Sequence, residues 1–222
     1  MFVGHYAAAY AAKAVRPTVP LWLLFVAVQF IDYVWAVLVV FGVERIRYEA
    51  GFTPGNSLDL IYIPYSHSLA GAVIWSVAFG FIYLAFKRGA GTRTSAVIVG
   101  IAAFSHWLAD LIVHVPDLPL LWDEPKVGFG LWRYFWASQI VEVGLLLAGL
   151  IWYLRVTTPT SIMGRVAPWL LFAFLVGLQA YNHIPAPEPP SPTFIGAQAL
   201  VAFSVLAFLA FLTEKTRVSA SA

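Results

Sequence analysis

The chain contains no cysteine among its 222 residues, and only 11% of them are charged. The absence of thiols excludes disulfides and thiolate metal sites, so any bound metal must be held by nitrogen and oxygen ligands. A soluble domain has about 25% charged residues, so this chain has too few for a surface that faces only water. Its net charge of +2 is too small for a nucleic-acid-binding surface, and we expect no nucleic acid among its partners.

Hydrophobic residues make up 61% of the chain and fall into long runs. Six runs reach about 20 residues, the length that crosses a bilayer as an α-helix. The predicted spans are Val19–Val43, His67–Phe86, Ser95–Val115, Trp132–Leu154, Ala167–His183 and Thr193–Leu212. A shorter, alanine-rich helix from Phe2 to Val15 either lies in the membrane interface or dips into the bundle as a re-entrant helix. The sequence therefore predicts an all-α, polytopic membrane helix bundle that forms one integral-membrane domain over residues 1–222.

Charge alternates between the segments that join the spans. Basic residues precede the first span, follow the sixth and occupy the loops after the second and fourth: Lys13, Arg16, Lys87, Arg88, Arg93, Arg155, Arg165, Lys215 and Arg217. Acidic residues dominate the other loops: Asp59, Asp117, Asp123, Glu124 and Glu188. Because basic loops stay on the cytoplasmic side, we expect a multi-pass protein of a bacterial inner membrane with both termini in the cytoplasm.

Six ionisable side chains lie within these spans or at their mouths: Asp32, His67, His106, Asp110, His114 and Glu142. A charged group at the bilayer centre costs roughly 2.5–3.5 kcal/mol on insertion scales, so these groups are expected to have partners. At a rise of 1.5 Å per residue, Asp32 and His106 lie roughly 15 Å below the outer surface and Glu142 lies roughly 13 Å below it, whereas His114 is shallow. Imidazole and carboxylate are also the groups that bind divalent metals.

The third span carries His106, Asp110 and His114 at intervals of four residues, which places all three on one helix face. Two of them can bind one ion, or Asp110 can orient an imidazole from behind. The alternative is a polar stripe that lines a water-filled crevice. Since Asp32 and His67 lie in the same half of the membrane, a metal site is the favoured interpretation.

Two other histidines can also be interpreted without a metal. His67 stands between Ser66 and Ser68, and if Ser66 only caps the helix, His67 merely sits at the interface. His5 lies eight residues before Lys13, so a re-entrant helix would lift it about 12 Å towards the other groups. If that helix lies in the interface instead, His5 has no role. A fifth histidine, at the end of the fifth span, is interpreted as an interfacial or gating residue.

Four short motifs follow one another in the first half of the chain: His5 in FVGHYAAAY, Asp32 in VQFIDYVW, Ser66-His67-Ser68 in IPYSHS, and His106 with Asp110 in SHWLADLIVH. In their order and spacing they resemble the YdjM-like membrane-bound metal-dependent hydrolases of bacteria. The chain departs from that family at Asp32, a single carboxylate where P-D-x-D is common, and at Tyr65, which replaces the Thr of a T-H-S motif. The Arg-Gly before that motif is also absent. The resemblance implies a divergent member with these metal ligands: Asp32, His67, His106, Asp110 and His5.

The leading functional hypothesis is a metal-dependent hydrolase that acts on a lipid or lipid-linked substrate near the outer leaflet, among membrane lipids. The expected cofactor is a divalent metal, with zinc first. Glu142 and Asp110 are the candidate catalytic groups, because a carboxylate that the metal leaves free can serve as general base. Two alternatives stay open: a cation or proton transporter that uses the same residues, and a non-catalytic protein whose metal is structural. The oligomeric state is left open.

Overall fold

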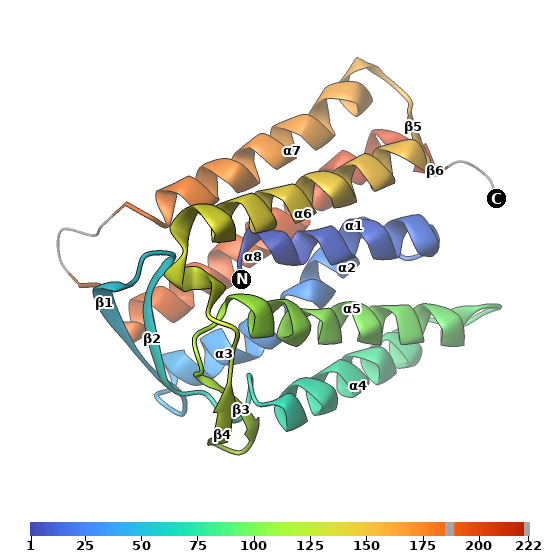
Figure 1. Cartoon of the computed structure of the whole chain (residues 1–222). Helices are drawn as coiled ribbons and strands as arrows, with labels where there is room; N and C mark the ends of the chain where they lie inside the picture. The colour runs from blue at the N-terminus through green and yellow to red at the C-terminus, as the bar shows by residue number, and fades with distance from the viewer. Residues whose placement is uncertain (185–188, 220–222) are drawn as a thin grey trace.

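The computed structural model describes residues 1–184 and 189–219, which consist mainly of α-helices packed side by side (Figure 1). The helices are α1 (Tyr6–Val15), α2 (Leu21–Val28), α3 (Phe30–Val40), α4 (Leu69–Phe86), α5 (Thr92–Val113), α6 (Phe135–Arg155), α7 (Ile162–Tyr181) and α8 (Pro192–Lys215), with short 3-10 turns η1 (Val3–His5) and η2 (Leu131–Arg133). Among the described helices, α4 to α8 are long and apolar enough to cross a membrane. If the bent pair α2–α3 forms one more span, the total is six. The predicted all-α membrane bundle is confirmed. Glu188, used above to orient the chain, lies outside the described residues.

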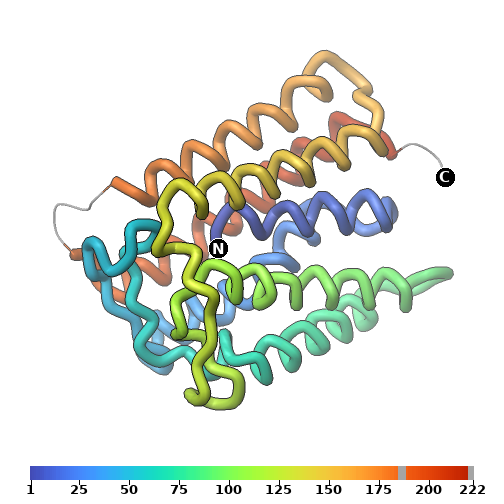
Figure 2. Tube along the Cα trace, viewed as in Figure 1, coloured from blue at the N-terminus to red at the C-terminus, as the bar shows by residue number. Residues whose placement is uncertain are grey.

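The short helix α1 lies inside the bundle. Figure 2 shows it in dark blue between α6 and α5, and it packs against α2 as well. Tyr6 and Tyr10 on this helix are fully buried, and both rings contact Phe25 of α2. Of the two positions that the sequence allowed for this segment, the structure therefore has the buried one. The aromatic side chains of α1 find apolar neighbours inside the bundle, and the residues of η1 are buried with them.

The close approach of α1 to α6 depends on Gly149. A Cβ atom added at this position would lie 2.8 Å from the Cα and the carbonyl oxygen of Ala7. Small residues at such a crossing let two backbones come together, as is common between helices in membranes.

Replacing Gly149 with alanine is expected to destabilise the protein by about 1–3 kcal/mol, because the new methyl group forces α1 away from α6. Gly144→Ala is the matched control on the same helix, since a Cβ there meets nothing within 4 Å. This control should be neutral or stabilising by up to about 1 kcal/mol, because alanine favours helix over glycine. Unfolding by SDS titration in mild detergent measures both, and equal effects at the two positions would contradict the prediction.

The predicted first span is broken into two helices. α2 and α3 meet at an angle of 54°, and Gln29 ends one helix and begins the next. In a continuous α-helix the carbonyl of Val28 would accept from the N–H of Asp32, four residues later. Here the Val28 carbonyl accepts a hydrogen bond from Nδ1 of His106 at 2.8 Å. The bend thus joins the first span to α5.

Two β-hairpins replace predicted outer loops at one end of the bundle. They are β1 (Arg45–Thr53) with β2 (Asn56–Tyr62), and β3 (Leu118–Leu121) with β4 (Glu124–Val127). A third antiparallel pair, β5 (Thr157–Pro159) with β6 (Arg217–Ser219), lies at the opposite end, near the C-terminal end of the chain (Figure 1). The alternation of charged and apolar residues in RIRY and the turn residues PGN were the missed signals of the first hairpin.

Candidate metal centre

Asp110 of α5 lies at the centre of a buried cluster of histidines. Its Oδ2 atom lies 3.0 Å from Nε2 of His106 and 3.7 Å from Nε2 of His67. Its Oδ1 atom lies 3.2 Å from Nε2 of His5 and 3.6 Å from Nε2 of His114. The backbone nitrogen of Met1 also approaches Oδ1. The cluster therefore has two sides that share one carboxylate.

Asp32 of α3 completes the Oδ2 side. Its Oδ1 atom lies 3.3 Å from Nε2 of His67 and 3.5 Å from Nε2 of His106. The side chain of Asp32 is 18% exposed, whereas those of His67, His106 and Asp110 are 4% exposed or less. Asp32 is therefore the most accessible of these four groups.

Asp32, His67 and His106 on the Oδ2 side have the spacing of ligands around one ion, and Asp110 lies beside the two imidazole nitrogens. A tetrahedral zinc site with bonds of about 2.0–2.1 Å has ligand atoms about 3.3–3.4 Å apart. The four distances between imidazole nitrogens and carboxylate oxygens run from 3.0 to 3.7 Å. Nε2 of His106 is buried and makes no hydrogen bond to any described residue. Since an orphaned buried nitrogen is costly, this atom in particular suits a metal. The buried histidine and aspartate groups of this membrane protein could hold a metal ion.

Three histidines are oriented by partners of their Nδ1 atoms. These partners, at 2.7–2.8 Å, are the carbonyl of Val28 for His106, Oδ1 of Asp117 for His114, and Oγ of Ser66 for His67. A carbonyl oxygen can only accept, so His106 carries a proton on Nδ1, and Nε2, the atom that faces Asp110, is the nitrogen left for an ion. Metal-binding histidines are held in this way, with one nitrogen on an acceptor and the other on the ion.

His5 belongs to the cluster. Its ring stacks on that of His106, with centroids 3.8 Å apart and planes inclined by 10°. Among the described residues, two overlapping groups have the spacing for an ion: one of Asp32, His67 and His106, and one of His5, His106 and Asp110. The sequence left His5 undecided, and the burial of α1 decides its position.

The structure brings together the five residues that the sequence predicted as ligands. Glu142, the candidate general base on α6, belongs to neither group among the described residues, and its Oε2 atom accepts the N–H of Phe2 at 2.8 Å. Its catalytic role stays a prediction. His114, predicted to be shallow, follows the last residue of α5, and its side chain is 3% exposed because its ring packs on Trp132.

The segment before α4 differs from the expected helix start. The helix begins at Leu69, and Ser68 caps it with its side chain, so Ser66 is not the cap. The carbonyl of His67 accepts a hydrogen bond from the indole N–H of Trp107 at 2.9 Å. His67 therefore lies in a turn ahead of the helix, with its ring in the cluster rather than at the interface.

Neither a protein-family model nor a curated protein nor a solved structure matches the chain. The function has to be inferred from the cluster itself. The resemblance to the YdjM-like hydrolases stays a prediction.

Glu44 is the residue that sequence reasoning missed. It follows the first span, is 1% exposed, and accepts three hydrogen bonds from Tyr65 and Ser66. Burial raises the pKa of Glu44 above its ordinary value, while His67 and these hydrogen bonds oppose that rise. An acid at the end of an apolar run is normally a solvated loop residue, so nothing in the sequence pointed to Glu44.

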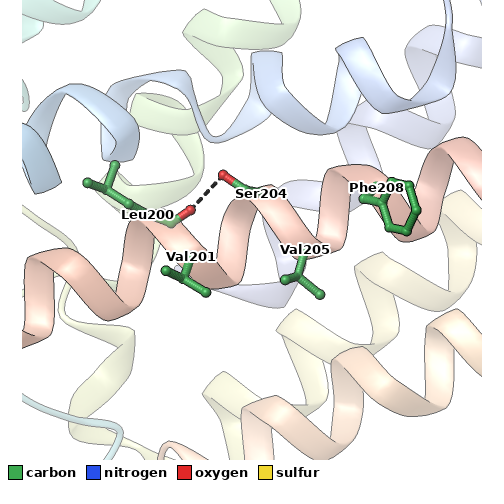
Figure 3. Close-up of a pocket in the computed structure, with 5 residues that line it drawn as sticks. All are labelled: Leu200, Val201, Ser204, Val205 and Phe208. Carbon is green, nitrogen blue, oxygen red and sulfur yellow. Dashed lines mark hydrogen bonds between the residues drawn. The ribbon is translucent and has the colours of Figure 1, made fainter.

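A hollow on the surface of α8 is chemically different from the cluster. It is lined by Leu200, Val201, Ser204, Val205 and Phe208 (Figure 3). Its one hydroxyl, on Ser204, already donates to the carbonyl of Leu200 at 2.7 Å. With no ionisable lining residue, this hollow suits lipid contact and offers no catalytic group.

Proposed function

We propose that the protein is a metal-dependent hydrolase of a bacterial inner membrane, and that it cleaves a lipid or lipid-linked substrate near the outer leaflet. The observation that carries this proposal is the position of two imidazole nitrogens, Nε2 of His67 and Nε2 of His106. Each of them lies 3.0–3.7 Å from a carboxylate oxygen of Asp32 and from one of Asp110. Zinc suits such nitrogen and oxygen ligands. The resemblance to the YdjM-like family, with its motifs at these same positions, supports the proposal.

In this proposal His67, His106, Asp32 and Asp110 hold the ion. A divalent ion supplies Lewis-acid polarisation and a hydroxide nucleophile at neutral pH. The exposed edge of Asp32 marks the side from which the substrate arrives. His5 lies against the other oxygen of Asp110, Oδ1, and is buried.

The membrane position selects the substrate class. The positive-inside rule places the basic loops in the cytoplasm, which puts the two hairpin-bearing loops, and the cluster beneath them, towards the outer face. A site within the outer half of a bilayer is reached most directly by a lipid. A phosphoester, an amide or an ester near the headgroup is the proposed scissile bond.

Removing the metal is expected to abolish hydrolysis. Purified protein in lipid vesicles would be assayed on phospholipids and lipid-linked sugars before and after treatment with a zinc chelator. Since a catalytic metal contributes several kcal/mol to the transition state, activity should fall by at least about a hundredfold and return with added zinc. Hydrolysis that persists without metal would contradict the proposal.

The same vesicles separate the hydrolase from the transporter alternative. Buried aspartate and histidine residues also relay ions in pumps, and such a protein would show metal-dependent flux without any hydrolysis product. A flux of this kind would replace the hydrolase proposal with transport.

A further inference from the structure

A chain of hydrogen bonds leads from Glu44 to the metal cluster. Oε2 of Glu44 lies 2.6 Å from the hydroxyl of Ser66, and the same hydroxyl lies 2.7 Å from Nδ1 of His67. Nε2 of His67 then faces both Asp32 and Asp110. All three members of this chain are at most 3% exposed, so water does not compete for these contacts.

The direction of each hydrogen bond follows from the contacts of Glu44. Its Oε1 atom accepts the backbone N–H groups of Tyr65 and Ser66 at 2.9 and 2.8 Å. A carboxylate that accepts several hydrogen bonds is favoured in its ionised form, so the hydroxyl proton of Ser66 points at Glu44. The lone pairs of Ser66 Oγ then face His67, whose Nδ1–H donates to them. Nε2 of His67 is then the ring nitrogen left for an ion.

We propose that Glu44 is a positioning residue of the metal centre, acting through Ser66 to fix the ring of His67 and to offer its Nε2 atom to the ion. This inference rests on the proposed metal site. Glu44 comes immediately before β1, so the relay ties the outer hairpin to the buried ligand. Partners of this kind typically change metal affinity by 10–100-fold when they are lost.

The chain provides a matched control in Asp117. Its carboxylate contacts Nδ1 of His114 at 2.8 Å, just as the Glu44–Ser66 pair supports His67. His114, however, lies on the Oδ1 side of Asp110, outside the four proposed ligands. Removing the charge of Asp117 therefore tests whether any buried carboxylate near the cluster matters, or only the one that supports a ligand.

The experiment measures zinc affinity of the detergent-purified full chain by competition with a chromophoric chelator. Glu44→Gln and Ser66→Ala are each expected to weaken binding by about 10–100-fold, and Asp117→Asn is expected to leave it unchanged. Thermal unfolding of each variant is recorded in parallel. Ser66→Ala removes a single hydroxyl, so it still tests the relay if Glu44→Gln fails to fold.

The double variant Glu44→Gln/Ser66→Ala distinguishes a relay from a general structural effect. If Glu44 acts through Ser66, the double variant binds zinc no more weakly than Ser66→Ala alone, whereas independent structural effects would add. Additive losses, or unchanged affinity in both single variants, would overturn the relay while leaving the proposed function standing. A wild-type protein that binds no zinc would overturn both.

Discussion

Replacing His106 with alanine is expected to strip the protein of metal, from near one ion per chain in the wild type to near none. His106 is the residue that both candidate groups share, so its loss removes a ligand from each of them. Its Nε2 atom is also one of the buried nitrogens that have no hydrogen bond to a described residue. Elemental analysis after gentle purification without chelators measures the loss.

Two further variants make this result interpretable. His183→Ala removes an imidazole that packs against Phe135 and belongs to neither group, so its metal content should equal that of the wild type. Asp32→Asn changes little in volume but removes the charge of a proposed ligand, so it should lose metal without a cavity. Metal-free wild-type protein, or a full metal content in His106→Ala, would contradict the metal-site proposal.

Replacing Lys13 with alanine is expected to lower the free energy of unfolding by about 3 kcal/mol, the low end of what breaking a buried ion pair costs. The Lys13 ammonium contacts Oε1 of Glu214 at 2.5 Å and donates to the carbonyls of Pro17 and Val19. The side chains of Lys13 and Glu214 are 6% and 24% exposed, so the loss leaves a carboxylate and two carbonyls poorly compensated. The pair also fixes the end of α1 against α8.

Arg47→Ala is the control for this second prediction. Arg47 pairs with Glu49 and Asp59 at 2.9 and 2.8 Å, but its side chain is 61% exposed. Exposed pairs contribute roughly 0–1 kcal/mol, so this variant should unfold almost as the wild type does. SDS titration of both variants in the same detergent gives the comparison, and equal losses would show that burial does not decide the strength of the Lys13 pair.

Local patterns in the sequence were enough for the helices and for the identity of the candidate ligands. The apolar runs predicted six spans, and the described helices account for five plus one bent pair, because hydrophobic length alone determines what can cross a bilayer. The four-residue spacing of His106 and Asp110 placed both on one helix face, and their contact at 3.0 Å follows from helix geometry.

Local patterns were not enough where a residue depends on a distant partner. The hairpins were predicted as loops, because their strands lie outside the hydrophobic runs that indicated the spans. Glu44 looked like an ordinary loop acid, because its contact with Ser66 joins positions 22 residues apart. Likewise, the break at Gln29 became evident only in the structure, where the Val28 carbonyl accepts a hydrogen bond from Nδ1 of His106.

The sequence by itself determined that this is a helical membrane protein whose buried histidines and aspartates need partners, because composition and the cost of charge in lipid are properties of single residues. Only the tertiary structure decided which of them meet. It placed His5 on His106 by burying α1, brought His114 beside Asp110, and left Glu142 against the backbone of Phe2. Those choices depend on packing between helices, as at Gly149 and Ala7, where the side chains of two segments must fit each other before either has a fixed position.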